Sequence, residues 1–162
     1  MTTDTVGRPL PTIYVHFSVL GRFNPAVVGD GLGLKPHRMW RKGDRIGRRR
    51  RVVEEDYWDY CIGPTLSSDF EPQLRALLDA ISPGANYLAK LRSGNEVQFL
   101  ITLAAWVPGN PLSYVPIASI DQGTMSEIAK IGAGLQFDIN LLGEDNSEAS
   151  DSNAMTKRDA LN

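Results

Sequence analysis

Two segments, one near each end of the chain, alternate apolar and polar side chains. Residues 12–20 place β-branched and aromatic residues at every second position, and residues 135–142 repeat this pattern with leucine, phenylalanine and isoleucine. A period of two residues is typical of a strand with one buried face. We therefore predict a first strand over residues 12–20 and a last strand over residues 135–142.

A third strand is predicted over residues 96–107, where apolar side chains become nearly continuous. The longest apolar run, residues 99–107, spans about nine residues, whereas a membrane-spanning helix needs roughly twenty. The run therefore predicts a buried strand and no membrane segment. After a Pro- and Gly-rich loop at residues 108–111, residues 114–118 form another extended piece.

Three helices are expected between these strands. The first covers residues 25–32, because Asn24 can cap it and Pro25 suits the first helical position, although Gly29 and Gly31 weaken it. A second helix begins after Asp69, has Pro72 in its first turn and ends at residues 83–84. Its apolar stripe consists of Phe70, Leu74, Leu77, Leu78 and Ile81.

The third helix begins at Asp121 or Thr124. Thr124 and Glu127 have the spacing of a capping box, and Gly132 or Gly134 supplies the left-handed residue that ends the helix. Residues 87–91 fit either a helical turn or a short strand.

A long hairpin is predicted from two aromatic segments, residues 38–42 and 56–62, which flank a charged connection. Arginines and carboxylates are expected to face one another across it. Hairpins mixed with helical crossovers indicate the α+β class, with a mainly antiparallel or mixed sheet and helices packed on one face.

Composition is consistent with one globular domain. The chain has 162 residues, of which 42% are hydrophobic and 22% charged, and such a length suits one core. We expect a flexible N-terminus over residues 1–10, one domain over 11–143 and a disordered polar tail over 144–162.

A cytoplasmic location is the default expectation. Cys61 is the one cysteine, so no intrachain disulfide can form, and the N-terminal residues lack the pattern of a secretory signal.

Charge is concentrated in one segment. Residues 35–51 hold nine of the seventeen Lys and Arg residues, although the net charge of the chain is only −2. The candidate binding surface comprises Trp40, Arg41, Lys42, Asp44, Arg48, Arg49, Arg50, Arg51, Tyr57 and Trp58.

This surface has three interpretations. Trp, Tyr and Arg often anchor protein interfaces, and Arg with aromatic residues also suits nucleic acid, although the pI of about 5.7 argues against the latter. The third interpretation is a solvated hairpin whose charges serve solubility, in which Trp40 and Trp58 are packing residues.

The sequence predicts no metal site, cofactor site or catalytic centre. His16, His37 and Cys61 are too few and too scattered for a zinc site, and His16 is expected to be a sheet residue. Residues 29–33 are glycine-rich but lack the ending of a phosphate-binding loop. Ser18, Ser67, Ser113 and Cys61 show no partner for nucleophilic catalysis in the sequence.

Carboxylate chemistry would require at least two of Asp44, Glu54 and Asp138 to meet in a pocket; the neighbouring Glu55 is a further carboxylate. Asp138, on the polar side of the last strand, is expected to accept hydrogen bonds from a helix or from residues 41–44.

Several motifs together resemble a bacterial family of unknown function, DUF4279. They are residues 32–36 (LGLKP), residues 40–44 (WRKGD), Tyr57-Trp58, the leucine-rich segment 74–81, and residues 131–139, and the likeness spans about residues 13–142. The resemblance implies a fold but no activity, cofactor or catalytic residue. The arginine run 48–51 and the long tail depart from the family pattern.

Three functional hypotheses follow. The first is a non-catalytic protein-binding module, for example one that covers another protein's surface as small α+β immunity proteins do. The second is nucleic-acid binding through Arg41, Lys42 and residues 48–51. The third is an enzyme with a carboxylate-based site.

Overall fold

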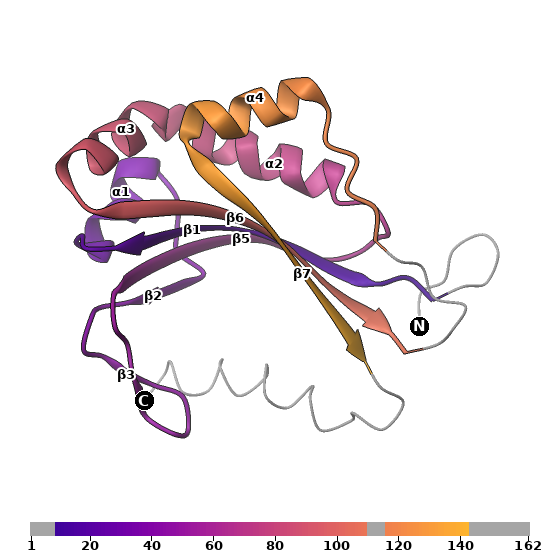
Figure 1. Cartoon of the computed structure of the whole chain (residues 1–162), viewed down its shortest axis with the longest axis horizontal. Coiled ribbons are helices and arrows are strands. Elements are labelled where there is room, and N and C mark those ends of the chain that lie inside the picture. The colour runs from indigo at the N-terminus through magenta and orange to yellow at the C-terminus, as the bar shows by residue number, and fades with distance from the viewer. Residues whose placement is uncertain (1–8, 110–115, 143–162) are drawn as a thin grey trace.

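The computed structural model of the chain describes residues 9–109 and 116–142, which form a five-stranded sheet with helices on one face (Figure 1). The strand order is β2-β5-β1-β6-β7. The bounds of these strands are β1 Thr12–Gly21, β2 Arg38–Trp40, β5 Asp56–Leu66, β6 Val97–Pro108 and β7 Ala133–Leu142. A separate two-stranded sheet pairs β3 (Arg45–Ile46) with β4 (Arg51–Val52).

The sheet is mixed but mainly antiparallel, as the alternation of strands and helices predicted. β1 is the central strand and runs antiparallel to both β5 and β6, and β2 is antiparallel to β5. Only β6 and β7 are parallel, because the chain between them crosses back over the sheet through a helix.

The helical segments are η1 Pro25–Val27, α1 Val28–Leu32, α2 Glu71–Ile81, η2 Ser82–Gly84, α3 Ala85–Gly94 and α4 Gln122–Ile131. The predicted cap forms at η1, where Asn24 accepts a hydrogen bond from the backbone N–H of Ala26 at 3.2 Å. The N-cap of α2 is Phe70, which offers no side-chain cap, and Asp69 lies one residue before it and accepts a hydrogen bond from the Glu71 N–H at 2.9 Å. Both hydrogen bonds satisfy donors that the first helical turn leaves free.

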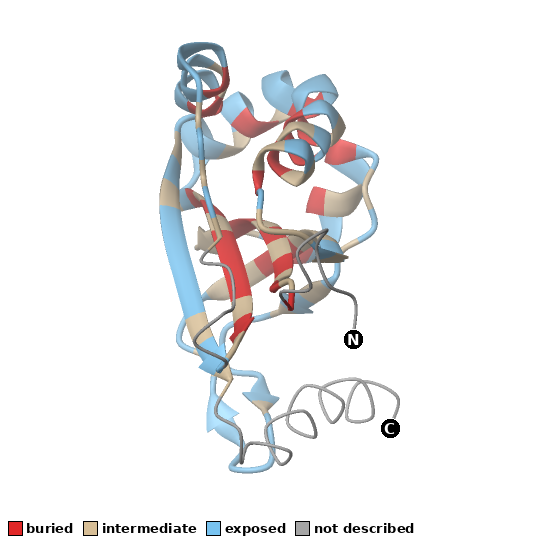
Figure 2. Cartoon of the chain, turned by 90° about the vertical axis from the view of Figure 1, so that its right-hand side faces the viewer, coloured by how far each residue is buried: buried red, intermediate tan, exposed pale blue. Residues whose placement is uncertain are grey.

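The core lies between the helices and one face of the sheet, as the buried positions in Figure 2 show. The alternating positions of β1 are fully buried, and the register places Val19 beside Phe99 and Phe17 beside Ile101 of β6. The apolar stripe of α2 packs against the same core. The sequence pattern therefore identified the buried face correctly.

The cap of α4 differs from the predicted capping box. Asp121, in extended conformation, accepts the hydrogen bond from the Thr124 N–H at 2.7 Å, while Thr124 itself lies within the helix and is buried. An N-cap must stand outside the helix, and Asp121 meets that condition. The predicted left-handed stop is Gly132, with a φ of 71°.

Residues 83–84 do not end helical structure. α2 stops at Ile81, but the 3-10 turn Ser82–Gly84 leads directly into α3, which contains residues 87–91. Pro83 lies in the first turn of the next helical segment, where its missing N–H removes no hydrogen bond. A proline there permits a change of helix direction without a loop.

The charged connection forms a small sheet of its own instead of extending the β2–β5 ladder. Between the β2–β5 ladder and this small sheet, the two arms of the hairpin are joined at Val53. The Val53 carbonyl accepts a hydrogen bond from the Gly43 N–H, and the Val53 N–H donates one to the Asp44 carbonyl, both at 2.9 Å. The β3–β4 hairpin then projects from the uncovered side of the main sheet (Figure 1).

The apolar side of β7 is only partly covered. Leu135 packs against the core, but Phe137, Ile139 and Leu141 remain exposed. α4 is the helix that covers this edge of the sheet, and β7 extends beyond it (Figure 1). Alternation alone therefore predicted the direction of these side chains but not their exposure.

Some predicted segments lie outside the described residues: the N-terminus up to residue 8, the loop from residue 110, the start of the extended piece 114–118, and the tail 144–162. Within the described part of that extended piece, Ile117 forms an isolated parallel bridge with Asp69.

Gly21, at the end of β1, lies where the backbone of β1 closely approaches the start of β6. Its φ is 128°, and a Cβ there would lie 2.0 Å from the carbonyl oxygen of Glu96. We expect Gly21→Ala to lower the free energy of unfolding by about 2 to 4 kcal/mol, through backbone strain and overpacking. The control is Gly94→Ala, where nothing lies within 4 Å and the change should be about 1 kcal/mol or less. Urea unfolding measures both, and equal effects would contradict the expectation.

Candidate functional site

The face of the sheet opposite the helices carries a cluster of polar side chains. Successive side chains of a strand point to opposite faces, so the residues that alternate with the buried positions of β1 and β5 share this face. They are Tyr14, His16, Ser18, Tyr57, Asp59 and Cys61. The register places His16 opposite Cys61 and Ser18 opposite Asp59.

Asp59 is the centre of this cluster. It has no exposed surface, and both of its carboxylate oxygens are bonded: Oδ2 lies 3.0 Å from His16 Nδ1, and Oδ1 accepts a hydrogen bond from Ser18 Oγ at 3.0 Å. The Tyr57 hydroxyl lies 3.3 Å from Ser18 Oγ. His16 and Ser18 thus supply the partners that a buried carboxylate requires, and Tyr57 bonds in turn to Ser18.

His16 is the positively charged partner of Asp59. Burial alone would lower the pKa of His16, but hydrogen bonds to Asp59 and Cys61 and the charge of the carboxylate raise it to about 9. Its side chain is 18% exposed. At neutral pH the two residues therefore form a largely buried ion pair in which Nδ1–H donates to Asp59.

Tyr57 completes the chain of hydrogen bonds. Burial and then the charge of Asp59 raise the pKa of Tyr57 to about 12, so its hydroxyl stays protonated at neutral pH. Because Ser18 donates to Asp59, the Tyr57 hydroxyl is the donor to Ser18 Oγ.

The second ring nitrogen of His16 faces a thiol. Cys61 Sγ lies 3.7 Å from His16 Nε2, and Cys61 is half-buried. The rings of Tyr14 and His37 lie beside the imidazole, with centroids 6.2 Å and 6.1 Å away. A nucleophile, a histidine and an orienting carboxylate are thus within reach of one another, an arrangement that nucleophilic chemistry requires.

Sequence reasoning treated His16 as a sheet residue and saw no partner for Cys61. The signal present in the sequence was the alternation, which puts His16 on the polar side of its strand and spaces Asp59 and Cys61 two residues apart on another. The pairing register that joins the three depends on tertiary structure.

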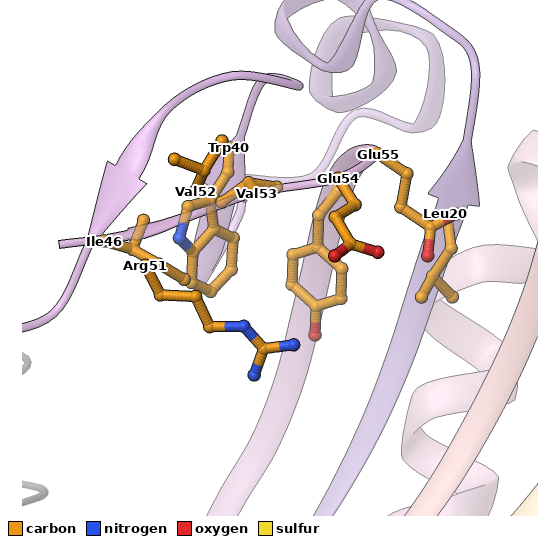
Figure 3. Close-up of a pocket in the computed structure, with 9 residues that line it drawn as sticks. Leu20, Trp40, Ile46, Arg51, Val52, Val53, Glu54 and Glu55 are labelled. Atoms are coloured by element: carbon orange, nitrogen blue, oxygen red, sulfur yellow. The ribbon is translucent and has the colours of Figure 1, made fainter. Parts of the chain in front are cut away.

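A pocket of about 410 Å³ lies between the β3–β4 hairpin and the end of the main sheet (Figure 3). It is lined by Leu20, Trp40, Ile46, Arg51, Val52, Val53, Glu54, Glu55 and Tyr57. The sequence-predicted residues that meet here are Trp40, Arg51 and Tyr57, which come from β2, β4 and β5.

Aromatic packing forms one wall of this pocket. The rings of Trp40 and Tyr57, opposite one another on β2 and β5, meet edge to face with centroids 4.7 Å apart. In Figure 3 the Trp40 and Arg51 side chains lie toward one end and Leu20 toward the other, with Glu54 between them. The pocket thus combines an apolar interior with charges of both signs.

Other predicted residues hold the hairpin in place. Asp44 accepts a hydrogen bond from the Arg41 N–H at 2.7 Å, the Arg41 guanidinium donates to Asn24 at 3.3 Å, and the Lys42 N–H donates to Asp56 at 3.0 Å. The carboxylates Asp44 and Asp56 therefore bind backbone N–H groups here, where the sequence had predicted charge pairs across the hairpin.

Arg48, Arg49 and Arg50 occupy the turn of the hairpin and are exposed. The turn is closed by a hydrogen bond from the Arg50 N–H to the Gly47 carbonyl at 2.9 Å. These three residues do not line the pocket, so they extend a positively charged surface beside it.

Trp58 requires a correction. It was predicted as part of the binding surface, with packing as the alternative, and it is fully buried among the core residues on the helix side of the sheet, as the packing interpretation has it. Neighbouring residues of a strand face opposite sides, so Tyr57 and Trp58 cannot both line a site on the uncovered side.

The structure separates the carboxylates of the third hypothesis. Asp138 lies on β7, at the opposite edge of the sheet from β2, with three strands between them, and its carboxylate accepts a hydrogen bond from Asn140 at 3.2 Å. Asp44 is held in its turn, and of the three residues only Glu54 lines the pocket. The predicted contact of Asp138 with a helix or with residues 41–44 is therefore wrong.

Within residues 9–109 and 116–142, no group of three or more His, Cys, Asp or Glu side chains is placed to hold a metal ion. Over the same residues, no helix combines the length and apolar character needed to cross a lipid bilayer.

The ion pair between His16 and Asp59 makes stability depend on pH. The folded protein retains the His16 proton up to about pH 9, whereas the unfolded chain loses it near pH 6.5. The stabilisation is therefore fully present below about pH 6.5 and is lost as the pH rises to about 9. We expect a loss of about 2 kcal/mol, reduced from the full linkage value by partial exposure.

Urea unfolding at pH 6 and pH 9.5 measures this effect, with His16→Gln as the reference that lacks the titrating group. The wild-type protein should lose more stability than the variant over this range. Equal losses would show that the ion pair does not contribute.

Comparison with known proteins identifies a family but no activity. No curated protein and no solved structure matches the chain. The sequence profile of a domain of unknown function, DUF4279, matches residues 11–142, which comprise the whole sheet and all the helices described above. The chain therefore belongs to the DUF4279 family.

Proposed function

We propose that this domain is a protein-binding module of the bacterial cytoplasm, non-catalytic at its binding pocket, and that a partner occupies the pocket beside the β3–β4 hairpin. The observation that carries the proposal is the pocket itself: about 410 Å³ of space lined by Trp40, Tyr57 and aliphatic side chains next to Arg51. Trp, Tyr and Arg in a desolvated pocket are the residues that most often dominate binding energy.

The partner is an acidic protein surface that inserts an apolar side chain. Residues 41–51 carry seven Lys and Arg residues and one Asp, and all eight are exposed. Such a concentration of positive charge speeds association with an acidic partner and sets its orientation. The aliphatic residues Leu20, Ile46 and Val52 of the pocket suit an aromatic or branched apolar side chain.

One form of this proposal is an immunity-like module that covers the acidic surface of a toxin domain. A small α+β scaffold with one uncovered sheet face and a projecting hairpin suits that role, because both surfaces can meet a partner without rearrangement.

Acidic peptides provide the test. An array of acidic peptides, with and without one central aromatic residue, should contain binders that require the aromatic residue, measured by fluorescence anisotropy. Trp40→Ala and Arg51→Glu should each weaken binding by about tenfold or more. The control is Lys90→Glu, an exposed charge on α3 outside the pocket, which should change the affinity by less than about twofold.

Circular dichroism and urea unfolding check whether Trp40→Ala remains folded. If Trp40→Ala unfolds, Arg51→Glu alone provides the test, because this substitution removes no aromatic packing. The proposal fails if no peptide binds, or if Lys90→Glu weakens binding as much as Arg51→Glu.

Nucleic acid is the competing occupant of the positive surface. Binding through phosphate contacts weakens steeply as salt rises, because each contact releases counterions. We expect duplex DNA and single-stranded RNA to give no gel shift at an ionic strength of about 0.15 M. A shift that persists there, and that disappears in Arg49→Glu/Arg50→Glu, would favour nucleic-acid binding over the acidic protein partner.

A further inference from the structure

We propose that Cys61, His16 and Asp59 form a peroxide-reactive thiol site on the uncovered face of the sheet. Cys61 is the nucleophile, His16 is the proton donor and Asp59 is a positioning residue. The site is separate from the proposed binding pocket, because none of the three residues lines that pocket.

The three side chains are fixed relative to one another by the pairing of β1 with β5. His16 lies directly opposite Cys61, and Asp59 is two residues from Cys61 on the same face. The imidazole therefore has one nitrogen 3.0 Å from the carboxylate and the other 3.7 Å from the sulfur. Ser18, on the other carboxylate oxygen, holds Asp59 in this orientation.

The charge of His16 gives the site its chemistry. With the pKa of His16 raised to about 9, both ring nitrogens carry protons at neutral pH, so Nδ1–H donates to Asp59 and Nε2–H to the sulfur. A thiol beside an imidazolium is the environment in which the reactive thiolate forms. The buried carboxylate keeps the imidazole charged and oriented.

The titratable and charged groups that face the site come from several elements. Tyr14 lies on β1, Tyr57 on β5, Arg38 on β2 directly opposite Asp59, and His37 immediately before β2. On β6 the residue opposite His16 is uncharged, Thr102. Burial and the charge of Asp59 raise the pKa of Tyr57 to about 12, so Tyr57 stays protonated over the pH range of the test below.

Access limits the reactant to a small molecule. Cys61 is half-buried, and the rings of Tyr14 and Trp106, with centroids 5.0 Å apart, pack on the same face close by. A hydroperoxide has only two oxygen atoms at its reacting end and needs no pocket of its own. The exposure and surroundings of Cys61 therefore favour a hydroperoxide over a larger electrophile.

The reaction is a two-electron oxidation. The Cys61 thiolate attacks one oxygen of the hydroperoxide, so that an S–O bond forms as the O–O bond breaks and sulfur transfers two electrons to the peroxide. The departing oxygen takes the proton from His16 Nε2 and leaves as water or an alcohol. The products are a sulfenic acid at Cys61 and a neutral His16.

The sulfenic acid is resolved by a second molecule. Cys61 is the one cysteine of the chain, so no intrachain disulfide can form. A low-molecular-weight thiol attacks the sulfenic sulfur, an S–S bond forms, and water leaves. The result is a reversible mixed disulfide on the uncovered face of the sheet.

The test compares the folded protein with its own unfolded chain. The full chain is treated with hydrogen peroxide at pH 6 in buffer and in urea, the sulfenic acid is trapped with dimedone, and the adduct is followed by mass spectrometry. An ordinary thiol, with a pKa near 8.5, is almost entirely protonated at this pH. We expect the folded protein to react at least about tenfold faster than the chain in urea.

Variants separate the three roles. His16→Gln should reduce the folded rate to that of the unfolded chain. Asp59→Asn should give a folded rate whose dependence on pH follows that of the unfolded chain, whereas the wild-type profile should differ from it. Asp138→Asn is the matched control: it makes the same change at an exposed carboxylate of β7 that lies outside the site and accepts a hydrogen bond from Asn140, and it should stay within about twofold of wild type.

The proposal is overturned if the folded wild-type protein reacts no faster than the chain in urea. This comparison requires no substitution, so it stands even where His16→Gln or Asp59→Asn fails to fold. It is also overturned if folded Asp59→Asn shows the wild-type pH profile.

Discussion

The pairing of β1 with both of its neighbours determines the rest of the structure. This strand is hydrogen-bonded to β5 on one side and to β6 on the other along nearly its whole length. A shift of one residue would move Phe17 and its apolar neighbours to the uncovered face and His16 into the core. The cost of burying a charged imidazole among the leucines of the helices fixes the register.

That same register creates the polar cluster. Once the alternate positions of β1 and β5 are committed to the core, their other side chains must share the opposite face, and His16 falls between Asp59 and Cys61. Removing the charge of one partner of a buried ion pair is costly, but the intact pair adds little to stability relative to well-packed apolar residues, because desolvation offsets much of the attraction. Its presence on a sheet that apolar residues could stabilise therefore suggests chemistry as the reason for these residue types.

The β3–β4 hairpin is largely independent of this cluster. It belongs to a separate small sheet, and its attachment depends on backbone hydrogen bonds to Asp44 and Asp56 and on the packing of Trp40 against Tyr57. The pocket forms where this attachment meets the end of β1. The molecule thus presents two different surfaces on its uncovered side, an apolar pocket beside positive charge and a compact polar cluster, connected through Tyr57, which takes part in both.

The sequence by itself determined the strands of the main sheet, the presence of α1, α2 and α4 and the buried face, because periodicity, caps and glycine stops act over a few residues. It did not predict β3 and β4, and it left residues 87–91 of α3 undecided between helix and strand. Within residues 35–60, which it placed at the surface, Trp58 and Asp59 are buried. Trp58 faces the helices because neighbouring residues of a strand point to opposite sides, and Tyr57 faces the uncovered side. Only tertiary structure decided the strand register, since the pairing of β1 with β5 joins residues from 35 positions apart, at Gly21 and Asp56, to 54 positions apart, at Thr12 and Leu66. For that reason the meeting of His16, Asp59 and Cys61, and the pocket between the hairpin and the sheet, could not be derived from the order of residues alone.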